Sequence, residues 1–299
     1  MDRYSNYIAV RRGYFITEAG SGDDPVSTSG TGEATSSMAG GSPPTEKEWE
    51  LIHKFRSRVE DVLDTDDKRS AHFLLRWIRA RDENLDKAEA MLRNSMKWRK
   101  ENDMDSVLNK PLDPFIKDTY PYYTEGHDYE GHPVREVHSG AWDMRKAIDA
   151  GKETEFQDFV NHFFESIMVA IRESGNLKGD GGGSSDWPHT QFIYICDWED
   201  YSYAQLINLK AVQALLKFAS QYEAHYPEIL YKVYFVNCPA IMPLFLKLLK
   251  PLLAPKTYSK IHIYGTNREE WEPILRGMMD PDKLWTRLGG NRVVPRTKF

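Results

Sequence analysis

The residues that could carry catalytic chemistry are scattered along this sequence and form no recognisable motif. The two cysteines, Cys196 and Cys238, have no arginine six positions further on, so neither fits a phosphatase-type loop. The chain also lacks a G-x-S-x-G nucleophile elbow, a G-x-x-x-x-G-K-[ST] phosphate loop and an H-E-x-x-H zinc motif. Asp197 is expected at the end of a strand, where it could be an acid or base or could cap the following segment. We therefore expect no catalytic residues and no enzyme activity.

The remaining polar features exclude several other classes of protein. His189, His225 and His262 show no metal-ligand spacing, so each fits a surface or core position better than a metal site. The net charge of −6 disfavours a nucleic-acid partner, because phosphate binding requires a basic face. The low cysteine content favours a reducing compartment, and no run approaches the about 20 apolar residues that span a bilayer. We expect a cytoplasmic protein with no metal and no cofactor.

The strongest signal is the segment FVNCPAIMPLFLKLLKPLLAPKTYSK at residues 235–260. It is apolar on almost every side, and it carries four lysines but no acidic residue. Pro243 and Pro251 limit its helix to about two turns. A helix that is apolar all round needs cover on every side, which a short crossover helix lacks unless a lipid or a bilayer supplies it. From the residues alone, a core helix and a lipid-contacting helix both remain open.

The elements around this segment indicate an α/β fold. Short, β-branched or aromatic runs at 191–197, 232–238 and 260–265 predict buried strands, and EGHPVREVHSG at 130–140 predicts another strand. Helical periodicity separates the three later runs, and residues 154–174 show it as well. A strand–helix–strand order that occurs twice predicts a mostly parallel sheet.

Composition divides the chain into four parts. Residues 1–45 are predicted to be a disordered extension, because their Gly/Ser/Thr/Pro-rich stretch has almost nothing to bury. Three amphipathic stretches in 46–105 predict a small helical unit. The α/β domain is expected at 106–292, followed by a tail at 293–299.

Several separate motifs give the chain a resemblance to a known family. PEILYKVYFVNCPAIMPLFLKLLKPLLAPKTYSKIHIYG (227–265) resembles the signature half of the CRAL-TRIO lipid-binding family, which includes phosphatidylinositol/phosphatidylcholine transfer proteins and tocopherol-associated proteins. LLRWIRARDENLDKAEAML (74–92) resembles the N-terminal helical unit of that family. EGHPV, ICDWE and LGG follow in the expected order, so the resemblance covers roughly residues 46–292.

This resemblance implies a hydrophobic pocket that is floored by the sheet and closed by a mobile gate helix. Alternating strand residues would line the pocket, among them Phe192, Tyr194 and Val236. The gate residues would be Pro243, Leu244, Phe245, Leu248, Leu249, Leu252 and Leu253. The gate would open on a membrane, so that one phospholipid or isoprenoid could be exchanged there.

The resemblance also suggests a headgroup site. Arg81, Glu228 and Lys260 match residues that contact inositol phosphate in phosphoinositide-binding members. This chain departs from that pattern at Asp82, which replaces a second basic residue, and at Arg135, which stands where an aromatic residue often follows Pro-Val. Each matching residue also has a structural interpretation: Arg81 as a surface ion-pair partner, Lys260 as a strand-edge gatekeeper and Glu228 as the start of the next segment.

Three functions therefore compete at this point. The first is a protein that transfers or presents a single lipid and associates transiently with membranes. The second is a lipid-regulated signalling adaptor that uses the fold as a protein-interaction surface. The third is an enzyme that depends on Asp197. An occupied pocket would favour the first function, and an empty pocket would favour the second.

Overall fold

The computed structural model describes residues 41–176 and 187–293. Most of the predicted extension at 1–45, and the tail from residue 294, lie outside these ranges. Within the described ranges, no helix is both long and apolar enough to cross a bilayer.

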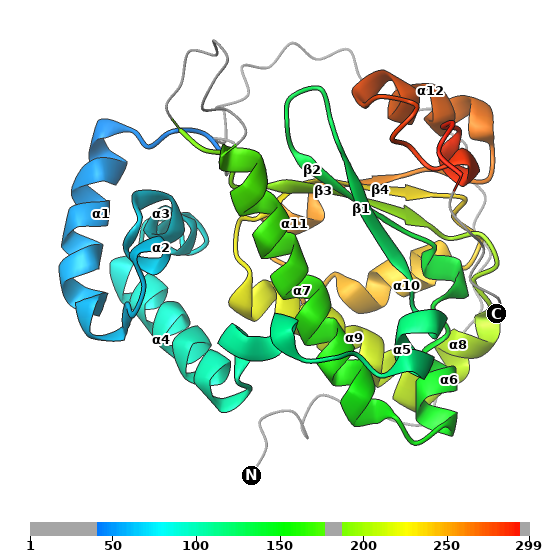
Figure 1. The fold of residues 1–299 in the computed structure, drawn as a ribbon, viewed down its shortest axis with the longest axis horizontal. Coiled ribbons are helices and arrows are strands. Elements are labelled where there is room, and N and C mark those ends of the chain that lie inside the picture. Colours follow the sequence, from blue (N-terminus) through cyan, green and yellow to red (C-terminus); the bar gives the residue numbers. More distant parts are fainter. Residues whose placement is uncertain (1–40, 177–186, 294–299) are drawn as a thin grey trace, which may run out of the picture. The chain divides into compact units, whose positions relative to one another are not determined.

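The first helices of the described chain share a core of their own. They are α1 (Glu46–Val59), α2 (Asp66–Arg69), α3 (Ala71–Arg79) and α4 (Leu85–Glu101), shown in blue to cyan in Figure 1. Thr45 begins α1 with a capping box, in which its hydroxyl accepts from the Glu48 N–H and the Glu48 carboxylate accepts from the Thr45 N–H. The apolar faces of α1, α3 and α4 enclose buried side chains such as Phe55, Trp77 and Leu92.

A five-stranded sheet follows, with its strands side by side in sequence order. The strands are β1 (Tyr122–His127), β2 (Pro133–Val137), β3 (Phe192–Asp197), β4 (Leu230–Val236) and β5 (Ile261–Ile263). β1 pairs with β2 in the antiparallel sense, and the other neighbours are parallel. The prediction of a mostly parallel sheet in an α/β fold is therefore confirmed. β1 was not predicted from the sequence.

Helices connect the strands and cover the sheet. The α-helices after α4 are α5 (Pro114–Thr119), α6 (Met144–Asp149), α7 (Glu153–Asn176), α8 (Tyr203–Ile207), α9 (Leu209–His225), α10 (Met242–Leu249), α11 (Pro255–Tyr258) and α12 (Arg268–Met278). Short 3-10 turns lie at η1 (Glu60–Val62), η2 (Met104–Asn109), η3 (Ser139–Ala141) and η5 (Thr286–Leu288).

The two faces of the sheet belong to different clusters of buried side chains. Side chains of α7, α9 and α10 pack on the face that carries Val233 and Phe235. The opposite face carries Tyr234 and Val236 and packs against Trp271 of α12. Adjacent residues of a strand point to opposite faces, so β4 contributes to both clusters.

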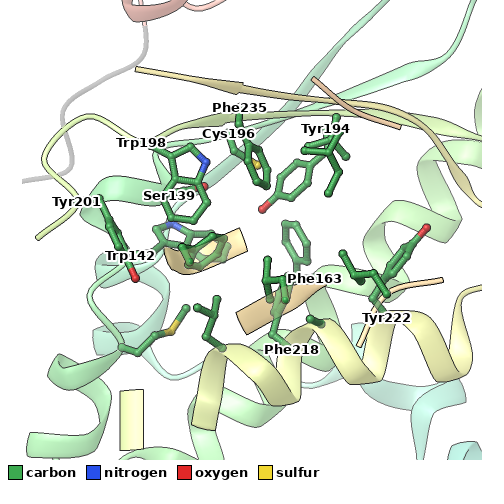
Figure 2. Close-up of a pocket in the computed structure, with 18 of the residues that line it drawn as sticks. Ser139, Trp142, Phe163, Tyr194, Cys196, Trp198, Tyr201, Phe218, Tyr222 and Phe235 are labelled. Atoms are coloured by element: carbon green, nitrogen blue, oxygen red, sulfur yellow. The ribbon is translucent and has the colours of Figure 1, made fainter. Parts of the chain in front are cut away.

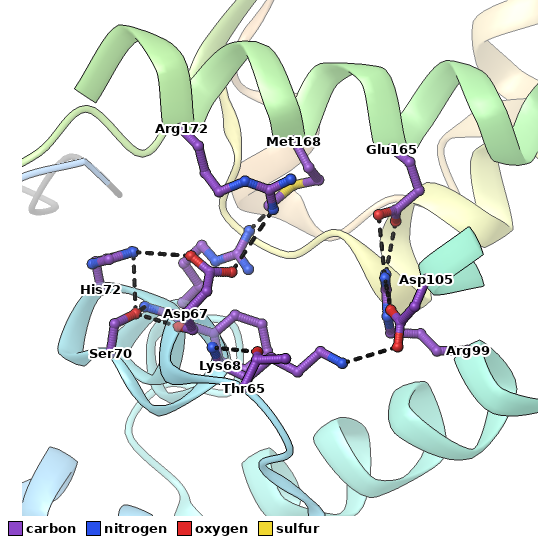
Figure 3. A network of polar contacts seen from close by, with 12 residues as sticks. Thr65, Asp67, Lys68, Ser70, His72, Arg99, Asp105, Glu165, Met168 and Arg172 are labelled. Carbon is purple, nitrogen blue, oxygen red and sulfur yellow. Dashed lines mark hydrogen bonds and ion pairs between the residues drawn. The ribbon is translucent and has the colours of Figure 1, made fainter. Parts of the chain in front are cut away.

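Charged side chains join the N-terminal helices to α7 (Figure 3). Arg99 of α4 donates to the Glu165 carboxylate of α7 at 2.7 Å and to Asp105 at 2.6 Å. The Tyr226 hydroxyl donates to the same Glu165 carboxylate at 2.9 Å. Because Glu165 and Arg99 are both largely withdrawn from solvent, this pair fixes α4 against the helix that covers the sheet.

Candidate functional site

An apolar cavity of about 150 Å³ lies between the sheet and the helices α7, α9 and α10 (Figure 2). The strands contribute Phe192, Tyr194, Cys196, Leu230, Val233 and Phe235 to its wall. The facing helices and turns contribute Phe163, Phe164, Leu215, Phe218, Tyr222, Phe245, Leu249 and Leu253. Cavities of this size with apolar walls tend to remain dry and to accept apolar guests.

The strand residues predicted to line the pocket divide between the two faces. Phe192 and Tyr194 lie on the cavity wall, and Figure 2 shows Tyr194 directed into the same space as Phe163 of α7, at 6.0 Å between the ring centroids. Val236 was placed wrongly: it is fully buried on the opposite face, in the cluster of Trp271. Because β4 is apolar on both faces, its sequence does not reveal which residues face the cavity, and Phe235 takes the position expected for Val236.

The helix predicted as the gate is α10, and it is shorter than the predicted segment. It ends at Leu249, and Pro243 occupies its first turn, where a missing N–H costs nothing. Phe245, Leu249 and Leu253 face the cavity. Phe245 also packs against Trp198, with 4.7 Å between the ring centroids.

The outer side of this segment carries apolar side chains together with a lysine. Pro243 and Leu244 are exposed, and Leu248 and Leu252 are half-buried. Lys247 is exposed as well. The segment therefore presents apolar side chains both inward and, to a smaller extent, outward.

Polar groups on the cavity wall are few and uncharged. Burial raises the pKa of the Cys196 thiol and holds the pKa of the Tyr194 hydroxyl well above its usual value. Burial also raises the pKa of Cys238 to about 12, so both thiols stay protonated at neutral pH. Ser139 adds one more hydroxyl to the wall. This wall can hydrogen-bond a ligand, but its one thiol, that of Cys196, is a poor nucleophile.

Asp197 serves the structure at the end of β3. It is fully buried, and one of its carboxylate oxygens accepts from the Glu199 N–H at 3.0 Å and from the Asn237 side chain at 2.8 Å. The other oxygen forms an ion pair with Arg287. These partners favour the capping interpretation of Asp197 over the acid or base interpretation.

Two residues of the predicted headgroup set form an ion pair. Lys260 lies 3.4 Å from the Glu228 carboxylate, and its ammonium donates to the Leu230 carbonyl at 2.7 Å. Arg81 instead donates to the Ala80 carbonyl at 2.8 Å. Glu228 also lines a second pocket, of about 170 Å³, beside the Asp82–Lys256 ion pair at 2.8 Å. Lys256 was not predicted as a site residue, although it lies in the same lysine-bearing segment as Lys260.

Arg135 is the most unusual charged group near the cavity. Only 2% of its surface is exposed, and its guanidinium lies 4.9 Å from the Tyr122 ring centroid and 5.8 Å from that of Phe163. Its Nη2 reaches Ser166 Oγ at 3.4 Å, and its Nη1 is buried without a hydrogen-bond partner. Burial lowers the pKa of Arg135 to about 10, so the group remains charged at pH 7. The sequence signal was the arginine itself, which stands after Pro133-Val134 where the family resemblance favours an aromatic residue.

A model of the CRAL/TRIO domain family matches residues 117–290. The chain belongs to this family. The matched region contains all five strands and every helix that lines the cavity. The resemblance inferred from the motifs is thus confirmed, and members of the family bind small hydrophobic lipids.

Curated relatives and a solved structure agree with this assignment. The chain is 28% identical over 240 residues to "Protein real-time" of Anopheles gambiae, which covers 80% of this chain and 34% of that protein. The protein of the same name from Aedes aegypti is 26% identical, with coverage of 80% and 36%. The chain therefore spans about a third of the length of these relatives. "Crystal structure of Sfh5" has a TM-score of 0.57 at 14% identity and covers 78% of this chain and 84% of that one, which shows a shared fold.

Val233 and Val236 of β4 lie on opposite faces of the sheet, so substitutions at these two positions should have different effects. Val233→Trp places a large ring in the cavity, so we expect it to weaken binding of a fluorescent fatty-acid probe by at least about tenfold. Val236→Ala removes methyl groups on the opposite face, so it should cost about 2 kcal/mol of unfolding free energy and leave the probe affinity unchanged. Probe titration and urea unfolding of both variants check this. Equal effects on affinity would contradict the assignment of the two faces.

Proposed function

We propose that the protein binds a single hydrophobic lipid in this cavity and transfers or presents it between membranes. The observation that supports this best is the apolar cavity itself, which is bounded on one side by the short helix α10. Each methylene that leaves water for such a site contributes about 0.8 kcal/mol before costs. A ligand with a long chain is therefore retained through purification.

The helix α10 is suited to act as the gate. It has eight residues, and cavity-facing side chains such as Phe245 and Leu249 supply much of its buried surface. Its link to the rest of the chain passes through Pro251, which cannot continue a helix. On a membrane, contacts with the bilayer can replace the contacts that these side chains make with the cavity wall. The helix α10 can then move, and a lipid gains access to the cavity.

Exposed apolar side chains near the gate support docking on a membrane. At the junction of α8 and α9, Tyr203, Ile207 and Leu209 are 58%, 66% and 60% exposed. Leu244 on α10 is 45% exposed. Both α9 and α10 line the cavity, so a membrane bound at these side chains lies next to the proposed exit.

Basic side chains add to this surface. Lys247 and Lys250 on and after α10 are exposed, and among the described residues neither forms an ion pair. Lysines near an anionic membrane surface contribute about 1 kcal/mol each. The proposed contact is therefore transient and sensitive to salt, which suits a protein that must leave the membrane with its ligand.

The proposed membrane contact can be tested with a pair of charge substitutions. Ile207→Asp with Leu209→Asp should slow transfer of a fluorescent lipid between vesicles by about tenfold or more, because two carboxylates replace the exposed apolar contacts. The matched control is Ile274→Asp on α12, which is 38% exposed and lies on the helix that covers the other face of the sheet. Normal transfer by the double variant, or equal loss in the control, would refute the docking surface.

We also propose that Arg81, Glu228 and Lys260 contact the headgroup when the ligand is a phosphoinositide. Because Lys260 pairs with Glu228, a phosphate must displace the Glu228 carboxylate before it can contact the Lys260 ammonium. This competition disfavours weakly binding ligands and so makes the site selective.

Lys260→Met with Glu228→Gln removes both charges of this pair and keeps the size of each side chain. Glu228 has a φ of 59°, so glutamine is preferred to a smaller residue because the backbone strain is then unchanged. Transfer of phosphatidylinositol should fall about tenfold while transfer of a neutral isoprenoid is retained. Unchanged phosphatidylinositol transfer would show that these residues do not bind the headgroup.

A further inference from the structure

The position of Arg135 in the sheet brings a buried charge close to the cavity. Arg135 lies directly opposite Tyr194 in the register of β2 and β3, so both side chains leave the same face of the sheet. Tyr194 lines the cavity. Phe163 also lines the cavity, and its ring centroid lies 5.8 Å from the guanidinium, so the charge borders a side chain of the cavity wall.

This guanidinium has no compensating charge in the described part of the chain. No carboxylate there lies within ion-pair distance of Arg135, and its two ring contacts and one long hydrogen bond leave Nη1 unsatisfied. Other buried arginines differ: Arg79 pairs with Glu48 at 2.7 Å, and Arg76 lies in the field of Asp67 and Glu165. A buried charge without a partner is costly, so the ligand-free protein carries a site that an anion would stabilise.

The wall beside Arg135 supplies further hydrogen-bond donors. The Tyr194 hydroxyl interacts with the side chains of Ser139 and Cys196. Ser139 and Tyr194 both line the cavity. A charged oxygen placed here receives hydrogen bonds from hydroxyl groups and the field of a guanidinium, in surroundings where water does not screen either.

We propose that Arg135 selects lipids that carry an oxyanion, either a carboxylate or a phosphate, and holds that group inside the cavity. This inference rests on the proposed lipid-binding function and specifies its ligand class. At the proposed headgroup site, Lys260 already pairs with Glu228, and the Arg81 guanidinium donates to the Ala80 carbonyl. Arg135 is instead unpaired, so a ligand oxyanion has most to gain there. A choline head, which ends in a fixed positive charge, is disfavoured next to it.

The direct test compares two ligands that differ only in the head. The full chain, stripped of lipid, is titrated with oleate and with oleyl alcohol by displacement of a fluorescent probe. Oleate should bind at least about tenfold more tightly. Both ligands bury the same hydrocarbon chain, and only oleate adds a charge-assisted contact with Arg135. Equal affinity for the two would exclude a carboxylate at the site. If phosphatidate is also not preferred over dioleoylglycerol, the inference is overturned and the proposed function still stands. Failure of both to bind would instead contradict the proposed function.

Two variants separate ligand selection from a structural role. Arg135→Met should remove the preference for oleate and raise the melting temperature of the ligand-free protein, because an unpaired buried charge is lost. The matched control is Arg172→Met, which should keep the preference for oleate. Arg172 lies on α7, its side chain is 46% exposed, and its guanidinium is 3.8 Å from the Asp67 carboxylate. A lower melting temperature with an unchanged preference in Arg135→Met would overturn the proposal. Arg135→Gln serves as the second variant, with the same expected loss of preference.

A second pair of ligands identifies the oxyanion. Dioleoyl phosphatidate and dioleoylglycerol share their chains and differ by a phosphate. A preference for phosphatidate that Arg135→Met abolishes would support a phosphate at the site, and a preference confined to oleate would support a carboxylate. Wild-type protein that prefers neither anion over its neutral partner would refute the selection of an oxyanion.

Discussion

A mostly parallel sheet must be covered on both faces, and this sheet is covered differently on each. Trp271 and Leu275 of α12 are fully buried against one face, so that side is a packed core. On the other face, large rings from α7 and α9 stand opposite rings from the strands, and the short helix α10 bounds the space left between them. The cavity therefore arises because the bulky side chains of the helices cover this apolar face of the sheet but do not fill all the space above it.

Polar interactions hold the frame around this space while the cavity wall remains apolar. The Arg99–Glu165 pair fixes α4 to α7, and Asp197 ties the end of β3 to Asn237, which directly follows β4. Asn237 lies just before α10, in the left-handed region of backbone conformation, with a φ of 53°. The turn that leads into the proposed gate is thus anchored at its start, and movement of α10 is expected to hinge there.

The sequence carried the strand pattern and the family motifs, but other features depend on contacts between distant residues. The runs that became β3, β4 and β5 were visible because they are apolar, short and separated by helical periodicity. β1 was missed because Tyr122–His127 contains polar residues and gains its strand character by pairing with β2. Val236 was misplaced because a strand buried on both faces has no polar alternation to show its orientation. The lack of an ion-pair partner for Arg135 could not be predicted, because it depends on which distant residues pack around the guanidinium in the fold.

The central claim is that the cavity holds a lipid, and native mass spectrometry of the protein purified from its own type of cell tests it most directly. Our account predicts one bound molecule per chain, which lipid extraction then identifies as a species with at least one long hydrocarbon chain. A protein that emerges from cells with its cavity empty, and that takes up no lipid from vesicles, would contradict the account and favour an adaptor that uses only the surface of the fold.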